Sequence, residues 1–74
     1  MNGRTQQVLE YIRKYRREKG ISPTYREIGL ACYITSTSGV RYHLDELERN
    51  GYITRHPGVP RGIVLNDDLV IATR

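Results

Sequence analysis

A run of small and hydrogen-bonding residues occupies the middle of the chain, over residues 36–42. Hydroxyl and guanidinium groups bind the edges of DNA bases and the phosphates between them. Arg41 has the geometry for a bidentate contact with guanine, and Tyr42 could pack on a thymine methyl group or donate to a phosphate. Small residues let a backbone approach such a partner closely. The pattern predicts base contacts by Ser36, Ser38, Gly39, Arg41 and Tyr42.

A second set of polar residues has the chemistry of phosphate contacts. Two of them lie at the start of a predicted short helix after residue 24, which would be the first helix of a helix-turn-helix motif. In such motifs this helix crosses the DNA backbone. Another opens the third helix, and two lie in a loop rich in proline and glycine. We therefore predict DNA-backbone contacts by Thr24, Arg26, Thr37, His56 and Arg61.

Residues that could hold a metal ion or catalyse a reaction are few and scattered. The single thiol, Cys32, and the two histidines, His43 and His56, do not have the spacing of zinc ligands. The carboxylates lack a paired nucleophile or a glycine-rich phosphate loop. We expect no enzymatic activity, no cofactor and no metal site.

Composition favours a polyanionic partner. The 74 residues suffice for one domain, and twelve Lys and Arg against eight Asp and Glu give a net charge of +4. Residues 1–26 hold seven of the basic residues and two of the acidic ones, although this is also the composition of a solvated helix face. A lone cysteine excludes an internal disulfide and predicts a cytoplasmic setting. No apolar run approaches the length of a membrane span.

Two helices are predicted in the first half of the chain. Apolar residues recur at helical spacing over residues 5–19, with Thr5 as the expected N-cap and Gly20 as the stop. Thr24 and Glu27 have the spacing of a capping box, which opens a second helix of about two turns. The inward-facing residues of this helix are expected to be Ile28, Ala31 and Leu30.

A third helix and a hairpin are predicted in the second half. A turn over residues 33–35, with Ile34 as its apolar plug, leads to a helix over residues 36–50. Ser36 is the expected N-cap, and the apolar spacing turns Val40, Leu44 and Leu47 inward. Strands are expected over residues 52–55 and 62–65, on either side of the loop 56–61.

This order predicts a mainly α fold with a small β-hairpin, a three-helix winged helix-turn-helix over residues 1–65. The tail, residues 66–74, carries two aspartates and then four apolar residues. It is compatible with an added edge strand, a self-association segment or a frayed end.

Four blocks of the chain resemble the amino-terminal DNA-binding domain of LexA-type repressors. They are SPTYREIG at 22–29, STSGVRYHL at 36–44, LERNGYI at 47–53 and PRGI at 60–63. The resemblance implies a repressor-like transcriptional regulator that binds double-stranded DNA sequence-selectively, with helix 36–50 in the major groove and wing 56–61 on the backbone or minor groove. Some members carry asparagine and acidic residues at the positions of Ser38, Arg41 and Tyr42, so the target sequence does not follow.

The resemblance also implies partners and a missing activity. A weak homodimer on a palindromic site is expected, without a membrane or a small-molecule substrate. Repressors of this family carry a self-cleaving domain with an Ala-Gly cleavage site and a serine activated by lysine. This chain has no Ala-Gly dipeptide and its only lysines are Lys14 and Lys19, so self-cleavage is not expected. The chain is either a fragment of such a repressor or a stand-alone module.

Other interpretations remain open on the residues alone. Arg41 could form a surface ion pair with Asp45, four residues further along the same helix. Winged helices also serve as protein–protein adaptors, since fold does not determine function. In that case the hairpin and the apolar residues 69–72 would contact a partner without direct DNA readout.

Overall fold

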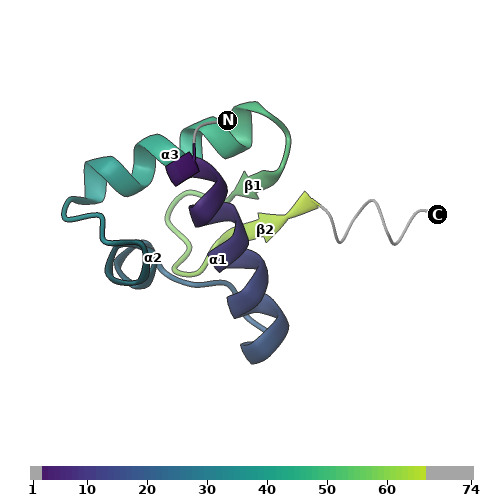
Figure 1. Cartoon of the computed structure of the whole chain (residues 1–74). Coiled ribbons are helices and arrows are strands. Elements are labelled where there is room, and N and C mark those ends of the chain that lie inside the picture. Colours follow the sequence, from purple (N-terminus) through teal and green to yellow (C-terminus); the bar gives the residue numbers. More distant parts are fainter. Residues whose placement is uncertain (1–2, 67–74) are drawn as a thin grey trace.

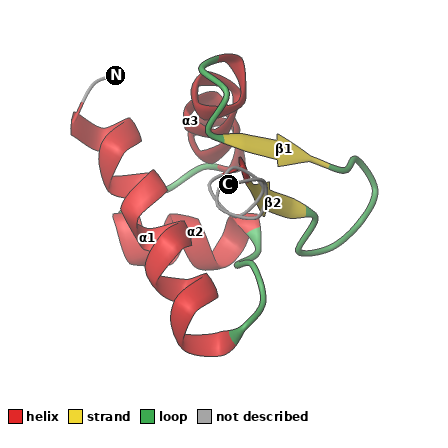
Figure 2. Cartoon of the chain, turned by 90° about the vertical axis from the view of Figure 1, so that its right-hand side faces the viewer, coloured by secondary structure: helices red, strands yellow, loops and turns green. Residues whose placement is uncertain are grey.

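The fold consists of three helices and a two-stranded antiparallel hairpin, as a computed structural model describes it for residues 3–66. The helices are α1 (Gly3–Lys19), α2 (Tyr25–Cys32) and α3 (Thr37–Arg49). The strands are β1 (Ile53–Arg55) and β2 (Ile63–Leu65), with Ile53 opposite Leu65 and Arg55 opposite Ile63. Figures 1 and 2 show the hairpin beside the helices, with α2 leading through a short turn into α3. The predicted winged helix-turn-helix is confirmed.

The core lies where the three helices meet the inner face of the hairpin. It is built from aliphatic side chains and the buried thiol of Cys32. Full burial of one Leu, Ile or Val side chain stabilises a fold by about 1.5–3 kcal/mol, so a small set suffices to position α3. The buried residues are Val8, Leu9, Ile12, Ile28, Cys32, Val40, Leu44, Leu47, Ile53, Ile63 and Leu65.

The start of α1 differs from the prediction. The helix begins at Gly3, so Thr5 lies inside it, fully buried, and is not the N-cap. Its Oγ1 lies 2.9 Å from Nδ1 of His43, a hydrogen bond that joins α1 to α3. Burial, followed by the nearby charge of Arg4, lowers the pKa of His43 and keeps its ring neutral at pH 7. The Thr5 hydroxyl, which the local sequence pattern predicts as a helix cap, therefore makes a tertiary contact with α3 instead. The predicted stop is confirmed, since Gly20 has a φ of +76°.

The capping box of α2 is confirmed, but two of its predicted inward residues are wrong. The Glu27 amide donates to Oγ1 of Thr24 at 3.1 Å, and the Thr24 amide donates to Oε1 of Glu27 at 2.8 Å. Leu30 and Ala31 are exposed, Leu30 by 74%. At 100° per residue a two-turn helix buries one narrow stripe. Here that stripe consists of Ile28, Gly29 and Cys32.

The turn and α3 follow the prediction closely. Ser36 is the N-cap, because its hydroxyl accepts from the Gly39 amide at 3.0 Å, and Ile34 packs against the core. Val40, Leu44 and Leu47 are buried. A Cβ on Gly39 would lie 2.7 Å from Cγ2 of Ile34, so glycine lets the apolar plug of the turn pack closely against the start of α3.

The hairpin is one residue shorter on each strand than predicted. A Cβ on Gly62 would lie 2.8 Å from the carbonyl oxygens of both His56 and Val59, so this glycine closes the wing loop. Asn66 donates to the Gly51 carbonyl from its side chain and to the Tyr52 carbonyl from its backbone. The rest of the predicted tail, residues 67–74, lies outside the described residues.

Candidate nucleic-acid interface

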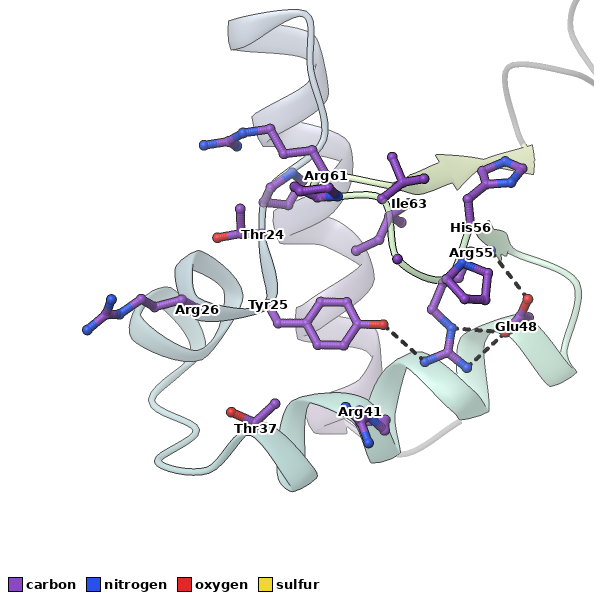
Figure 3. A pocket seen from close by; sticks show the side chains of 16 residues that line it. Thr24, Tyr25, Arg26, Thr37, Arg41, Glu48, Arg55, His56, Arg61 and Ile63 are labelled. Carbon is purple, nitrogen blue, oxygen red and sulfur yellow. Dashed lines mark hydrogen bonds and ion pairs between the residues drawn. The ribbon is translucent and has the colours of Figure 1, made fainter.

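An open groove of about 780 Å³ lies between the start of α2, the face of α3 and the wing loop, and we call it the wing groove. Its walls come from three segments that are far apart in the sequence (Figure 3). Six of the predicted contact residues line it, both from the base-contact set and from the backbone set. They are Thr24, Arg26, Thr37, Arg41, His56 and Arg61.

The exposed side of α3 carries the predicted base-contact residues. Ser36, Ser38 and Arg41 are exposed, and Gly39 is half-buried. Tyr42 is 55% exposed, with its ring edge-on to His43 at 5.1 Å between centroids. The helix therefore presents hydroxyls and a guanidinium to solvent at its amino-terminal half, while its opposite side anchors it in the core.

Arg41 does not form the ion pair with Asp45 that the sequence left open. Asp45 pairs with Arg55 of β1, and among residues 3–66 Arg41 has no acidic partner. The guanidinium of Arg41 stands at the edge of the wing groove in Figure 3. An unpaired arginine on a solvent-facing helix is available for a partner.

Arg61 is held within the domain. Its Nη1 donates to Oε1 of Glu27 at 2.8 Å, to the Ser22 carbonyl at 3.0 Å and to the Tyr15 hydroxyl at 3.1 Å, and its Nη2 donates to the second oxygen of Glu27 at 3.2 Å. We call Arg61, Glu27 and Tyr15 the wing latch, since they tie the wing loop to α2 and α1. A phosphate contact by Arg61 stays a prediction, but its hydrogen bonds first position the wing.

Electrostatics strengthen the wing latch at neutral pH. The hydrogen bond from Arg61, followed by the backbone amide of Thr24, lowers the pKa of the Glu27 carboxyl from 4.5 to about 2. A carboxyl with a lowered pKa in the folded state contributes stability above its unfolded pKa and loses that contribution as the pH falls. The latch is therefore complete above about pH 4.5 and is lost as the pH falls toward 2.

Glu27→Gln should lower the melting temperature at pH 7, because glutamine retains the cap but loses the ion pair with Arg61. The difference from the unmodified protein should shrink below pH 4.5 and be largely lost near pH 2, where Glu27 is protonated in the unfolded chain and half protonated in the folded chain. Thermal denaturation followed by circular dichroism between pH 7 and 2 measures it. Glu10→Gln, on an exposed pair with Arg13, is the matched charge change. If the melting temperatures of Glu27→Gln and Glu10→Gln changed with pH in the same way, the wing latch would be contradicted.

Sequence reasoning missed Arg55, the residue that ties the wing to α3. Its side chain is only 18% exposed, its Nε donates to Oε1 of Glu48 at 2.9 Å, and its Nη2 pairs with Asp45. The side-chain hydrogen bond from Arg55, followed by the one from its backbone amide, lowers the pKa of the Glu48 carboxyl. The Tyr25 hydroxyl lies 3.5 Å from Nη1 of Arg55 and joins α2 to the cluster (Figure 3). Two carboxylates one turn apart on α3 were the only signal in the sequence for a basic partner.

Two kinds of structural feature are absent from residues 3–66. Within that range no three His, Cys, Asp or Glu side chains gather closely enough to hold a metal ion. No helix in it combines the length and apolar character needed to cross a bilayer.

The comparisons with known proteins all indicate the same family. The family model of the LexA DNA binding domain matches residues 1–62. The LexA repressor of Geotalea uraniireducens is 52% identical over 62 residues, which are 84% of this chain and 31% of that protein. The LexA repressor of Caldicellulosiruptor saccharolyticus is 48% identical over 63 residues, 85% of this chain and 31% of that protein. The chain thus spans about a third of the length of these relatives.

Proposed function

Since the chain belongs to the family of LexA DNA-binding domains, we propose that it binds double-stranded DNA sequence-selectively as the winged helix-turn-helix of a transcriptional repressor. One observation carries the proposal: the polar side of α3 faces solvent, and its Arg41, which has no ion-pair partner within residues 3–66, lines an open groove together with Arg26 and Arg61. A regulator of this kind works by occupying DNA and needs no catalytic group of its own.

The proposed contacts divide between reading and positioning. The amino-terminal half of α3 enters the major groove, where Ser36, Ser38, Gly39, Arg41 and Tyr42 meet base edges. Phosphates are contacted by Thr24 and Arg26 of α2, by Thr37, and by His56 and Arg61 of the wing, which lies on the backbone or in the minor groove.

We further propose that two copies act together. A single reading helix contacts only a few base pairs, so useful selectivity requires a palindromic site with half-sites about one helical turn apart. The free chain would then be at most a weak homodimer. Its place is the cytoplasm at the nucleoid, and neither a membrane nor a small-molecule substrate is part of the proposal.

Binding to duplex DNA should weaken steeply with salt, because each cation placed on a phosphate releases counterions. Each such contact makes the slope of log K against log salt more negative by about 0.9. Arg26→Ala removes one predicted phosphate contact, so it should weaken binding to all duplexes by a similar factor. It should also make the salt slope less negative by about 1. Fluorescence anisotropy with selected and random duplexes between 50 and 300 mM salt, roughly the range of the counterion effect, measures both quantities.

Arg17→Ala is the matched control, since Arg17 is exposed on α1 and lines none of the grooves near α3. It removes the same charge and should leave the slope nearly unchanged. A chain that shows no salt-dependent binding to any duplex, but forms a complex with another protein through the hairpin, would replace the proposal with the adaptor function.

A further inference from the structure

Tyr33 combines two features that are unusual for a tyrosine. It is the C-cap of α2 and has the left-handed backbone, with φ of +59° and ψ of +40°. A side chain other than glycine or asparagine in this conformation costs free energy. The side chain is also 83% exposed, so burial does not offset that cost. An exposed aromatic residue held in a strained conformation indicates a function outside the folding of the domain.

The surroundings of Tyr33 have the chemistry of an anion site. A second groove, of about 680 Å³, runs along the helix-turn-helix turn, and we call it the turn groove. No carboxylate is among the side chains that line it, whereas the guanidinium of Arg26 and five hydroxyl groups are. The hydroxyl groups belong to Tyr25, Tyr33, Thr35, Ser36 and Thr37. Such a set of donors suits a phosphate, and the lining offers no carboxylate to a cationic partner.

The turn groove continues the proposed DNA-binding surface. Tyr25, Arg26 and Thr37 line both it and the wing groove, so they form a ridge between the two. In Figure 3 the side chain of Arg26 points away from the wing, past the outer side of α2. A duplex seated on α3 would therefore bring a strand to the turn groove on the side away from the wing.

We propose that the Tyr33 hydroxyl donates a hydrogen bond to a phosphate of the bound DNA, in the turn groove on the side of α3 away from the wing. The inference rests on the proposed function. It adds a contact with the DNA backbone from the turn between α2 and α3, beyond those proposed for the two helices and the wing. The exposed side chain of Tyr33 leaves its hydroxyl accessible to a phosphate, and Arg26, which lines the same groove, supplies positive charge to it.

Two substitutions distinguish the contribution of the Tyr33 hydroxyl from that of its backbone conformation. Tyr33→Phe keeps the ring and the backbone conformation, so its melting temperature should equal that of the unmodified protein, while its affinity for duplex DNA should fall about tenfold. Tyr33→Gly relieves the left-handed strain, so it should raise the melting temperature and still lower affinity about tenfold. Fluorescence anisotropy and thermal denaturation on the same samples measure both.

Tyr52→Phe is the matched control, because Tyr52 is 36% exposed but lines neither groove. It should bind DNA like the unmodified protein. Duplexes carrying one neutral methylphosphonate linkage at a time should include one that binds the unmodified protein and Tyr33→Phe equally, which locates the phosphate.

Several outcomes would overturn the inference. Affinities of both Tyr33 variants within twofold of the unmodified protein would overturn it and leave the proposed function intact, as would a methylphosphonate series with no position that removes the difference. A free-protein dimer that dissociates in the Tyr33 variants without a change in DNA affinity would assign Tyr33 and the exposed Leu30 to a second copy of the chain. Absence of salt-dependent DNA binding by the unmodified chain would overturn both.

Discussion

Arg41→Ala should remove most of the discrimination at one base pair of the target site while changing the affinity for random duplex much less. A bidentate contact between arginine and the O6 and N7 atoms of guanine contributes about 1–3 kcal/mol of discrimination against the wrong base. Arg41 is exposed, has no ion-pair partner within residues 3–66 and lies beside the wing groove, so a DNA contact by its guanidinium would not require breaking an internal ion pair.

The measurement is a selection of preferred sites followed by anisotropy with each single-base variant of the best site. The unmodified domain should lose affinity by about 5-fold to 150-fold when the contacted guanine is replaced, and Arg41→Ala should lose almost none. Arg49→Ala is the control on the same helix, since Arg49 lies in the last turn and pairs with Glu46 at 2.5 Å. Unchanged base preferences in Arg41→Ala would show that Arg41 serves only as surface charge.

Local signals in the sequence predicted the helices and their order. The capping box at Thr24 and Glu27 and the N-cap at Ser36 each satisfy backbone amides within three residues, so nothing distant is needed to read them. The apolar spacing of α3 determined which side is buried and, by subtraction, which residues face solvent. That is why the candidate reading surface could be predicted before any fold was known.

The remaining errors came from contacts between distant residues. Thr5 looks like a cap locally, but its hydroxyl meets His43, 38 residues away. Arg61 looks like a free cation in a loop, but Glu27, 34 residues earlier, binds it. In α2, the alternation of apolar residues could not say how narrow the buried stripe would be, so Leu30 was placed inside. Sequence spacing describes an element and its neighbours, whereas these residues are defined by packing between elements.

Arg55→Ala should impair both the stability of the domain and its affinity for DNA, for separable reasons. Arg55 is largely buried and pairs with Asp45 and Glu48 across the junction of β1 and α3. Exposed ion pairs contribute about 0–1 kcal/mol and breaking a fully buried pair costs about 3–5 kcal/mol, so this half-buried pair should cost about 1–2 kcal/mol. For a domain of this size that corresponds to a loss of roughly 4–16 °C in melting temperature.

The effect on DNA comes from the carboxylate that Arg55 leaves behind. Glu48 lines the wing groove, and without its partner it would present an uncompensated negative charge to an approaching phosphate. Affinity should therefore fall at least about tenfold at low salt, and less at high salt, where the repulsion is screened. Anisotropy at two salt concentrations measures this part independently of stability.

A second substitution separates the two effects. Glu48→Gln in the Arg55→Ala background removes the one of the two uncompensated charges that lines the wing groove, so it should restore much of the affinity. The lost packing of Arg55 should leave the melting temperature low. Recovery of both together would mean that the affinity loss was only partial unfolding. Recovery of neither would mean that Glu48 does not face the DNA, and that the wing groove is not where the phosphates lie. The double variant therefore tests the placement of the duplex as well as the role of Arg55.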